Sequence, residues 1–235
     1  MAKLTIDGRK IEAKEGSTIL QNIRTMNIDL PTLCQHDELS SFGACRLCTV
    51  EVKANGKWQL ATSCNTPVTA GMQVMTASDR AKDARKLAAS LLYYKYPNTK
   101  VIRDAAEKAG VAVSPSDAEG RDCILCGLCT RTCHEIVQAC ALTFEDRGLN
   151  RDMDEPGIRF ESDACIGCGS CAYVCPTGFV RMETTGEKRI IWDKVFRMAA
   201  CEVCGRYFAP EDQLAFISGK TGVLISRLRV CTSCR

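Results

Sequence analysis

The first 78 residues alternate between hydrophobic and polar positions in a way that predicts two β-hairpins with a helix between them. KLTIDGRKIEA alternates on both sides of an Asp-Gly dipeptide, which is typical of a tight hairpin turn. ILQNIRTM has helical spacing and follows Ser17 and Thr18, either of which can cap a helix. CTVEVKANGKWQLATSC alternates again around an Asn-Gly dipeptide. We therefore expect residues 1–78 to form one small β-rich domain.

A helical stretch and a polar boundary follow this domain. SDRAKDARKLAASLLYYKY, residues 78–96, has apolar residues at helical spacing, starts with a serine or an aspartate that can cap a helix, and ends before Pro97. The short helical pattern RDAAEKAG then leads into SPSDAEG, whose composition predicts a loop. These signals divide the chain into a domain over 1–78, a helical linker over 79–120, a second domain over 121–185 and a tail over 186–235.

The chain has seventeen cysteines, and they indicate the class of protein more strongly than its length does. Most of them stand in C-x2-C pairs, whose thiols pair poorly as structural disulfides but converge well on one metal. The sequence also opens without an apolar signal segment, which argues against a secreted disulfide framework. We therefore expect metal ligands, and a disulfide scaffold is the weaker alternative.

The net charge of +3 changes its meaning when the expected metals are counted. Thiolate ligands and positive metal cores together bring the loaded protein to about −5. The basic residues then balance buried negative groups, so we expect no nucleic-acid partner. No apolar run approaches the ~18 residues that a membrane span needs. We accordingly expect a cytoplasmic protein without a membrane span.

Two cysteine runs with the same spacing carry the strongest signal. CILCGLCTRTC and CIGCGSCAYVC both read C-x2-C-x2-C-x3-C, in which three thiolates hold one [4Fe–4S] cluster and the fourth holds its neighbour. Gly127, Gly167 and Gly169 would let backbone N–H groups approach the sulfur atoms. Two adjacent clusters suit electron transfer rather than bond chemistry. By this rule the first cluster is held by Cys123, Cys126, Cys129 and Cys175, and the second by Cys165, Cys168, Cys171 and Cys133.

Another set of four cysteines lies in the first domain. Cys34, Cys45, Cys48 and Cys64 are separated by ten, two and fifteen residues. Plant-type [2Fe–2S] ferredoxins use C-x4-C-x2-C with a distant fourth cysteine, so the set matches except for a longer first loop. We predict a β-grasp [2Fe–2S] domain in which the small residues at 43 and 44 let the loop fold tightly over the cluster. A zinc site or unliganded thiols are the alternative.

The tail carries two more C-x2-C pairs, Cys201 with Cys204 and Cys231 with Cys234. Two such pairs form a tetrahedral site of four sulfurs, which suits Zn²⁺ or one iron. Between them RYF predicts a strand, and APEDQLAFI predicts a helix that starts with proline and acidic residues. We expect a zinc-ribbon-like module with structural Zn²⁺. A further iron–sulfur cluster is the first alternative, and a single iron or empty thiols the second.

Three residues near these motifs are expected to have lesser roles. Cys140 lies off every pattern in an apolar run, which favours a buried core thiol over a ligand. His36 and His134 are single histidines, and we expect them beside the ligands or exposed to solvent. His134 also stands where the first run usually carries proline. No catalytic residue is predicted, because the chain has no G-x-G-x-x-G or other nucleotide-binding loop.

LPTLCQHDELSSFGACRLCTVEV, followed by DCILCGLCTRTCHEI and CIGCGSCAYVCPTG, resembles a known iron–sulfur arm. This arm is shared by the large iron–sulfur subunit of respiratory complex I, the diaphorase small subunit of NAD-linked hydrogenases and the N-terminal part of iron-only hydrogenases. The resemblance covers about residues 1–185 and implies that the chain connects a flavin–NAD(P)H subunit to a partner. The family usually has a further cluster between these domains, held by one histidine and three cysteines. Residues 65–122 contain neither residue type, so that cluster cannot be present.

Together these features predict an α+β electron-transfer subunit of a multi-subunit NAD(P)-linked oxidoreductase in an anaerobic cytoplasm. We expect a hetero-oligomer in which the [2Fe–2S] centre exchanges electrons with a flavoprotein subunit. The [4Fe–4S] pair would exchange them with a second catalytic subunit or ferredoxin. Candidate complexes are a flavin-based electron-bifurcating transhydrogenase, which the missing cluster favours, an NAD-linked hydrogenase and a formate dehydrogenase. A free-standing polyferredoxin and a redox-sensing nucleic-acid-binding protein are the alternatives.

Overall fold

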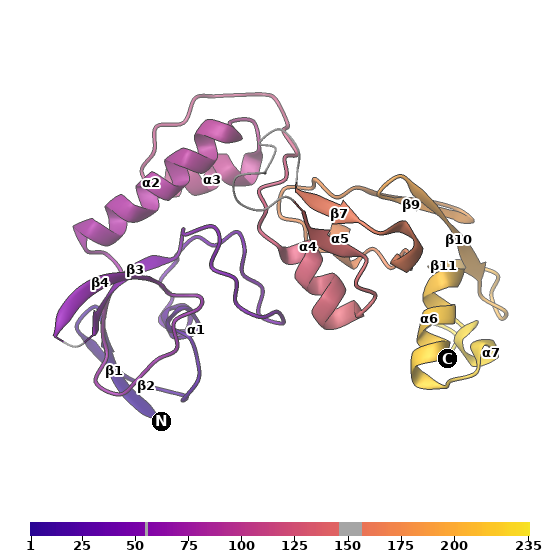
Figure 1. Cartoon of the computed structure of the whole chain (residues 1–235), viewed down its shortest axis with the longest axis horizontal. Coiled ribbons are helices and arrows are strands. Elements are labelled where there is room, and N and C mark those ends of the chain that lie inside the picture. Colours follow the sequence, from indigo (N-terminus) through magenta and orange to yellow (C-terminus); the bar gives the residue numbers. More distant parts are fainter. Residues whose placement is uncertain (55, 146–156) are drawn as a thin grey trace. The chain divides into compact units, whose positions relative to one another are not determined.

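The computed structural model describes residues 1–54, 56–145 and 157–235, which form two compact units, Met1–Gly127 and Leu128–Arg235 (Figure 1). The first unit contains one sheet and the second contains two, and each unit has its own buried apolar clusters. Within the described ranges, the helices are too short or too polar to cross a lipid bilayer.

A five-stranded mixed sheet organises the first unit. Its strands are β1 (Ala2–Ile6), β2 (Arg9–Ala13), β3 (Thr49–Ala54), β4 (Lys57–Thr62) and β5 (Gln73–Met75), in the order β2-β1-β5-β3-β4. The hairpins β1–β2 and β3–β4 are antiparallel, whereas β1 and β5 run parallel. Both predicted hairpins are therefore confirmed.

Helix α1 (Ile19–Thr25) packs against this sheet. Thr18 caps it: its hydroxyl accepts from the backbone of Gln21, whose side chain in turn accepts from the backbone of Thr18. Ile23 is fully buried in the core that the strands form. Of the two caps that the sequence offered, Thr18 is the one used.

Helices α2 (Asp79–Lys95) and α3 (Lys100–Lys108) complete the first unit. Ser78 caps α2, as its sequence predicted, and the helix ends before Pro97. The two helices pack around Ala89 and Ala106, which share a buried cluster with Leu47. Because Leu47 lies between two predicted ligands, the helices support the loop that carries those cysteines.

The second unit begins with α4 (Leu128–Arg131), which continues as a π-helical segment, η1 (Thr132–Val137). A proline at position 134 would lack a backbone N–H and would interrupt this helix, so His134 is compatible with its continuation. Two short strands, β6 (Leu142–Phe144) and β7 (Ile158–Phe160), pair antiparallel. They are followed by η3 (Ser162–Ala164) and α5 (Ser170–Tyr173).

A four-stranded antiparallel sheet occupies the rest of the second unit. Its strands are β8 (Met182–Thr185), β9 (Lys188–Ile191), β10 (Lys194–Ala200) and β11 (Tyr207–Pro210), in the order β11-β10-β9-β8. Strand β8 precedes the boundary predicted at 185/186, and the other three follow that boundary. Two helices come last, α6 (Glu211–Thr221) and α7 (Ile225–Leu228). Leu214 of α6 is buried against Ala199 and Leu228.

We predict that Arg85→Ala loosens the first unit. The Arg85 guanidinium donates to the carbonyls of Thr49 at 2.7 Å and Thr76 at 2.8 Å, and so ties α2 to the sheet. Losing a donor from two partly buried carbonyls costs about 1–3 kcal/mol. Hydrogen exchange of the β3 amides should accelerate accordingly, whereas Lys86→Ala, one residue further along the exposed side of α2, should leave it unchanged. Equal exchange rates in both variants would contradict this role.

Candidate metal centres

The four predicted ligands of the first unit interact with one another. Cys34, Cys48 and Cys64 are buried, and the sulfurs of Cys34 and Cys45 lie 3.4 Å apart. A hydrogen bond from Cys64 lowers the pKa of Cys48 to about 6, and the same pairing raises the pKa of Cys64. The pairing with Cys34, together with burial, raises the pKa of Cys45. Four clustered, largely desolvated thiols, which would repel one another once ionised, fit a site whose negative charge a metal core would neutralise.

The loop around these thiols is tightly fixed. Ser63 donates its hydroxyl to the carbonyl of Cys48 at 2.8 Å. Gly43 has a φ of +71°, and a Cβ placed there would lie 2.8 Å from Nδ2 of Asn65. Ala44 is exposed. The predicted tight fold over the site therefore holds for Gly43 and not for Ala44.

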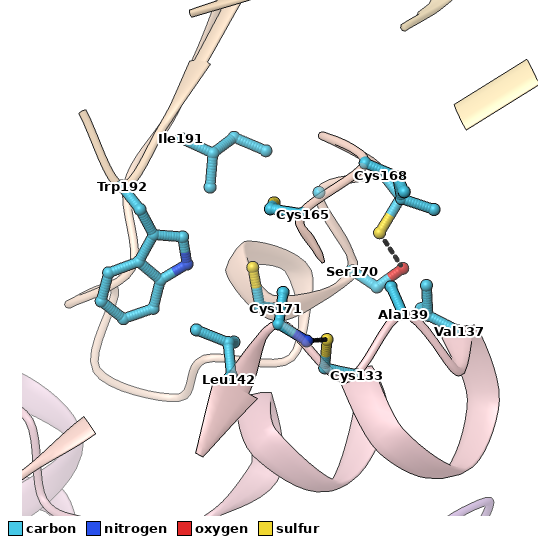
Figure 2. A pocket seen from close by; sticks show the side chains of 13 residues that line it. Cys133, Val137, Ala139, Leu142, Cys165, Cys168, Ser170, Cys171, Ile191 and Trp192 are labelled. Carbon is cyan, nitrogen blue, oxygen red and sulfur yellow. Dashed lines mark hydrogen bonds between the residues drawn. The ribbon is translucent and has the colours of Figure 1, made fainter. Parts of the chain in front are cut away.

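In the second unit, four predicted ligands line a single cavity: Cys133, Cys165, Cys168 and Cys171 (Figure 2). The other lining residues are mostly apolar, among them Leu142. Burial raises the pKa values of Cys133 and Cys165, and it raises that of Cys171 to about 11. The cavity is thus a largely apolar space lined by four thiols, and a positive partner would favour ionisation of the three whose pKa values burial raises, which fits the predicted [4Fe–4S] core.

Hydrogen-bond donors face these thiols. The backbone N–H of Ala141 donates to Sγ of Cys133 at 3.3 Å, which opposes the effect of burial on its pKa. The backbone N–H of Gly167 acts in the same way on Cys165. Donors of this kind stabilise the ionised ligands and the reduced state of a cluster.

Two glycines of the ligand loop are needed for close packing. A Cβ on Gly167 would lie 2.6 Å from the ring of Phe196, and one on Gly169 would lie 2.5 Å from Sδ of Met182. Both glycines also have positive φ values, +69° and +85°. The sequence analysis explained these glycines by the approach of backbone N–H groups to sulfur. The structure shows a second reason, because side chains of β8 and β10 leave no room for a Cβ at either position.

The remaining ligands predicted for the [4Fe–4S] pair are divided between the units. Cys129 and Cys175 belong to the same apolar cluster of the second unit as Cys133. Cys123 and Cys126 lie in the first unit, shortly before its last residue. The four cysteines of the second predicted set therefore lie around one cavity, whereas the first predicted set has two cysteines in each unit.

The four cysteines of the tail converge: the sulfurs of Cys201, Cys204, Cys231 and Cys234 all lie within 4.8 Å of one another. Cys201 follows β10, and Gly205, at φ +70°, donates its N–H to the carbonyl of Cys201 at 2.8 Å. The backbone N–H of Cys231 lowers the pKa of Cys201 to about 6, and hydrogen bonding with Cys204 raises that of Cys234 to about 12. This set can hold one metal ion.

The prediction for Cys140 is wrong, because its side chain is exposed rather than buried. It follows η1 with a φ of +54°, and its neighbours Ala139 and Ala141 supply the apolar contacts instead. His36 accepts at Nδ1 from the backbone of Glu38 at 3.2 Å, and Nε2 of His134 lies 2.7 Å from the carbonyl oxygen of Leu142.

Sequence reasoning missed Trp192 and Lys194, which also belong to the second site. Trp192 lines the cavity, and Lys194 donates to the carbonyl of Cys165 at 3.3 Å. A signal was present in KRIIWDKVFRM, where two short segments rich in β-branched and aromatic residues flank a Trp-Asp dipeptide and pair as strands. Two-residue hairpin turns usually contain glycine, so a turn made of Trp192 and Asp193 indicates that the surrounding residues fix the position of the indole.

Two protein families match the chain. Residues 1–79 match the 2Fe-2S iron-sulfur cluster binding domain, and residues 122–179 match the 4Fe-4S dicluster domain. The chain therefore contains one domain of each kind, in mixed α and β structure, with the tail cysteines beyond both.

Related proteins are oxidoreductase subunits. The NADP-reducing hydrogenase subunit HndD of Solidesulfovibrio fructosivorans is 33% identical over 230 residues, which cover 85% of this chain and 38% of that protein. The mitochondrial NADH-ubiquinone oxidoreductase 78 kDa subunit of Candida albicans is 39% identical over 72% of this chain and 21% of its own length. The chain thus spans less than two fifths of each. A crystal structure of an NAD⁺-reducing [NiFe]-hydrogenase superposes with a TM-score of 0.51 at 26% identity, over 63% of this chain and 71% of that one.

We predict that Gly167→Ala impairs cluster assembly. The new Cβ would collide with the buried Phe196 ring, which cannot move aside without disturbing the ligand loop. Iron and acid-labile sulfide bound after anaerobic purification should fall. Gly186→Ala is the matched control, because Gly186 also has a positive φ but has open space around it. A normal iron content in Gly167→Ala would contradict the steric argument.

The predicted resemblance is confirmed by these matches. Both domain families are found in the predicted order, and the relatives include subunits of a hydrogenase and of an NADH-ubiquinone oxidoreductase. The chain thus carries a 2Fe-2S iron-sulfur cluster binding domain and a 4Fe-4S dicluster domain, and it is similar to iron–sulfur subunits of NAD(P)-linked oxidoreductases.

Proposed function

We propose that this chain relays single electrons between a flavoprotein that reacts with NAD(P)H and a second catalytic subunit or ferredoxin. The observation that carries the proposal is the succession of a 2Fe-2S domain and a 4Fe-4S dicluster domain, together with the similarity to the NADP-reducing hydrogenase subunit over 85% of this chain. The chain would act in a cytoplasmic hetero-oligomer. Among the candidate complexes we favour an electron-bifurcating transhydrogenase, because residues 65–122 lack the ligands of the usual additional cluster.

The predicted ligand sets are part of this proposal. Cys34, Cys45, Cys48 and Cys64 would hold the [2Fe–2S] centre. The second set of the pair would place its [4Fe–4S] cluster in the cavity of Figure 2. When bound, the clusters supply one-electron Fe³⁺/Fe²⁺ chemistry, while the chain supplies burial and hydrogen bonds that set the potentials. The first set of the pair is Cys123, Cys126, Cys129 and Cys175.

We further propose that the tail site holds Zn²⁺. In a tetrahedral site with Zn–S bonds of about 2.3 Å, neighbouring sulfurs lie about 3.8 Å apart. The sulfurs of Cys204 and Cys231 lie 3.8 Å apart, and all four lie within 4.8 Å. An iron–sulfur core would interpose several atoms and separate its ligands further, so this spacing supports one ion.

The domain limits of the sequence analysis remain our proposal for the functional parts. A β-grasp domain over 1–78 is supported by the mixed sheet and α1. A zinc-ribbon-like module over 186–235 is supported by two C-x2-C turns with β11 and α6 between them. The other parts are the helical linker over 79–120 and the ferredoxin-like domain over 121–185.

Anaerobic purification with metal analysis tests the proposal. We expect about ten iron atoms with matching sulfide, about one zinc, and a flavoprotein that co-purifies with the chain. Isolation of a fully loaded monomer without a flavoprotein would contradict the relay between subunits. Extra iron and sulfide in place of zinc would contradict the tail assignment.

We predict that Cys204→Ser releases zinc but retains iron. Serine removes one of four thiolate ligands, and a site with three thiolates binds Zn²⁺ more weakly. Cys140→Ser is the matched control, because Cys140 is also exposed but belongs to no predicted site. Zinc content measured by mass spectrometry should fall only in Cys204→Ser. Unchanged zinc there would show that the ion binds elsewhere.

A further inference from the structure

The hairpin of β9 and β10 contacts the loop that carries three ligands of the second site. The guanidinium of Arg189 donates to the carbonyl of Gly167 at 3.1 Å and to that of Cys168 at 3.4 Å. The ammonium of Lys194 donates to the carbonyl of Cys165 at 3.3 Å. Two cations are thus held beside the backbone of the ligand loop.

Trp192 lies at the turn of this hairpin in an unusual backbone conformation. Trp192 and Asp193 have φ values of +53° and +62°, which two-residue turns usually reserve for Asn and Gly. A bulky residue in this region is a steric outlier that persists only when its surroundings fix it. The indole stacks on Phe160, with 5.8 Å between ring centroids and 17° between the ring planes, and it meets Phe179 edge-on with 6.1 Å between centroids. The orientation of the indole is therefore determined from two sides.

The indole N–H is buried and has no aligned acceptor among the described residues. Nε1 of Trp192 is shielded from solvent and makes no well-aligned hydrogen bond to any described protein atom. Figure 2 shows this nitrogen facing the sulfur of Cys171 across the cavity. A buried N–H without a partner is costly, so its position indicates that the acceptor is bound in the cavity or is the ionised ligand.

We propose that Trp192, assisted by Arg189 and Lys194, sets the reduction potential of the [4Fe–4S] cluster held by the second ligand set. The inference rests on the ligand assignment in the proposed function. Reduction adds negative charge to a cluster, and an N–H donor at sulfur and nearby cations stabilise that charge. The hairpin therefore raises the potential of this cluster, so that it accepts an electron more readily than it would without the hairpin.

The test is an EPR-monitored redox titration of the anaerobically purified, cluster-loaded protein. In Trp192→Phe one [4Fe–4S] midpoint should become more negative by about 59 mV, a tenfold change in its reduction equilibrium. The other [4Fe–4S] cluster and the [2Fe–2S] centre should keep their potentials. Trp58 is the chain's other tryptophan and lies on β4, so Trp58→Phe should shift none of the three midpoint potentials.

A second variant separates the N–H from the bulk of the ring. Replacing Trp192 with 3-benzothienylalanine keeps two fused rings but puts sulfur in place of the N–H. We expect the same negative shift as in Trp192→Phe. A wild-type potential in this variant would overturn the role of the N–H, because only packing would then explain the phenylalanine result.

The charge contribution has its own comparison. Lys194→Met should shift the same midpoint to a more negative value, whereas Lys194→Arg should retain it. Lys188→Met, at an exposed position of β9, is the control. Two [4Fe–4S] signals with no shift in any variant would overturn this inference and leave the proposed function intact. A wild-type protein without two [4Fe–4S] clusters would overturn both.

Discussion

Burial of many thiols that must ionise is the constraint on which the rest of the structure depends. Cys34, Cys48 and Cys64 are almost completely shielded from water. In the second unit, burial raises the pKa values of Cys133, Cys165 and Cys171. A buried thiolate is unfavourable unless charge or hydrogen bonds compensate it. The proposed metal cores would supply the charge, and the polypeptide supplies the donors. Sheets, helices and glycines are arranged around that requirement.

The three sites meet this constraint to different degrees. At the tail site the backbone N–H of Cys231 already stabilises Cys201 as a thiolate, so the site is prepared for a small cation. In the first unit, the hydrogen bond between Cys48 and Cys64 favours one thiolate beside one protonated thiol, and a bound metal core would take the place of the remaining proton. The second unit adds an aromatic and cationic hairpin. These differences suit one structural ion and several centres whose potentials must differ for electrons to move in sequence.

Much of this arrangement could be predicted from local signals. Hairpin turns and the Ser78 and Thr18 caps are encoded within a few residues, and the structure agrees with them. The two C-x2-C pairs of the tail are equally local signals, and their four sulfurs converge. Contacts between distant segments could not be predicted in this way. The approach of Phe196 to Gly167 joins residues 29 positions apart, and nothing in either segment alone specifies it. The prediction that Cys140 is buried was wrong for a related reason, because an apolar stretch of sequence does not determine which of its side chains points into the core.

Electron transfer through this chain requires that the [2Fe–2S] centre be connected to the [4Fe–4S] pair, although the usual intermediate cluster has no ligands here. The most direct measurement is freeze-quench EPR of the purified complex after mixing with NAD(P)H, comparing the wild type with Cys48→Ala. The account predicts that signals from both cluster types develop within turnover in the wild type. In Cys48→Ala the [4Fe–4S] signals should fail to develop at the wild-type rate. Their appearance at an unchanged rate would contradict a path through the first domain.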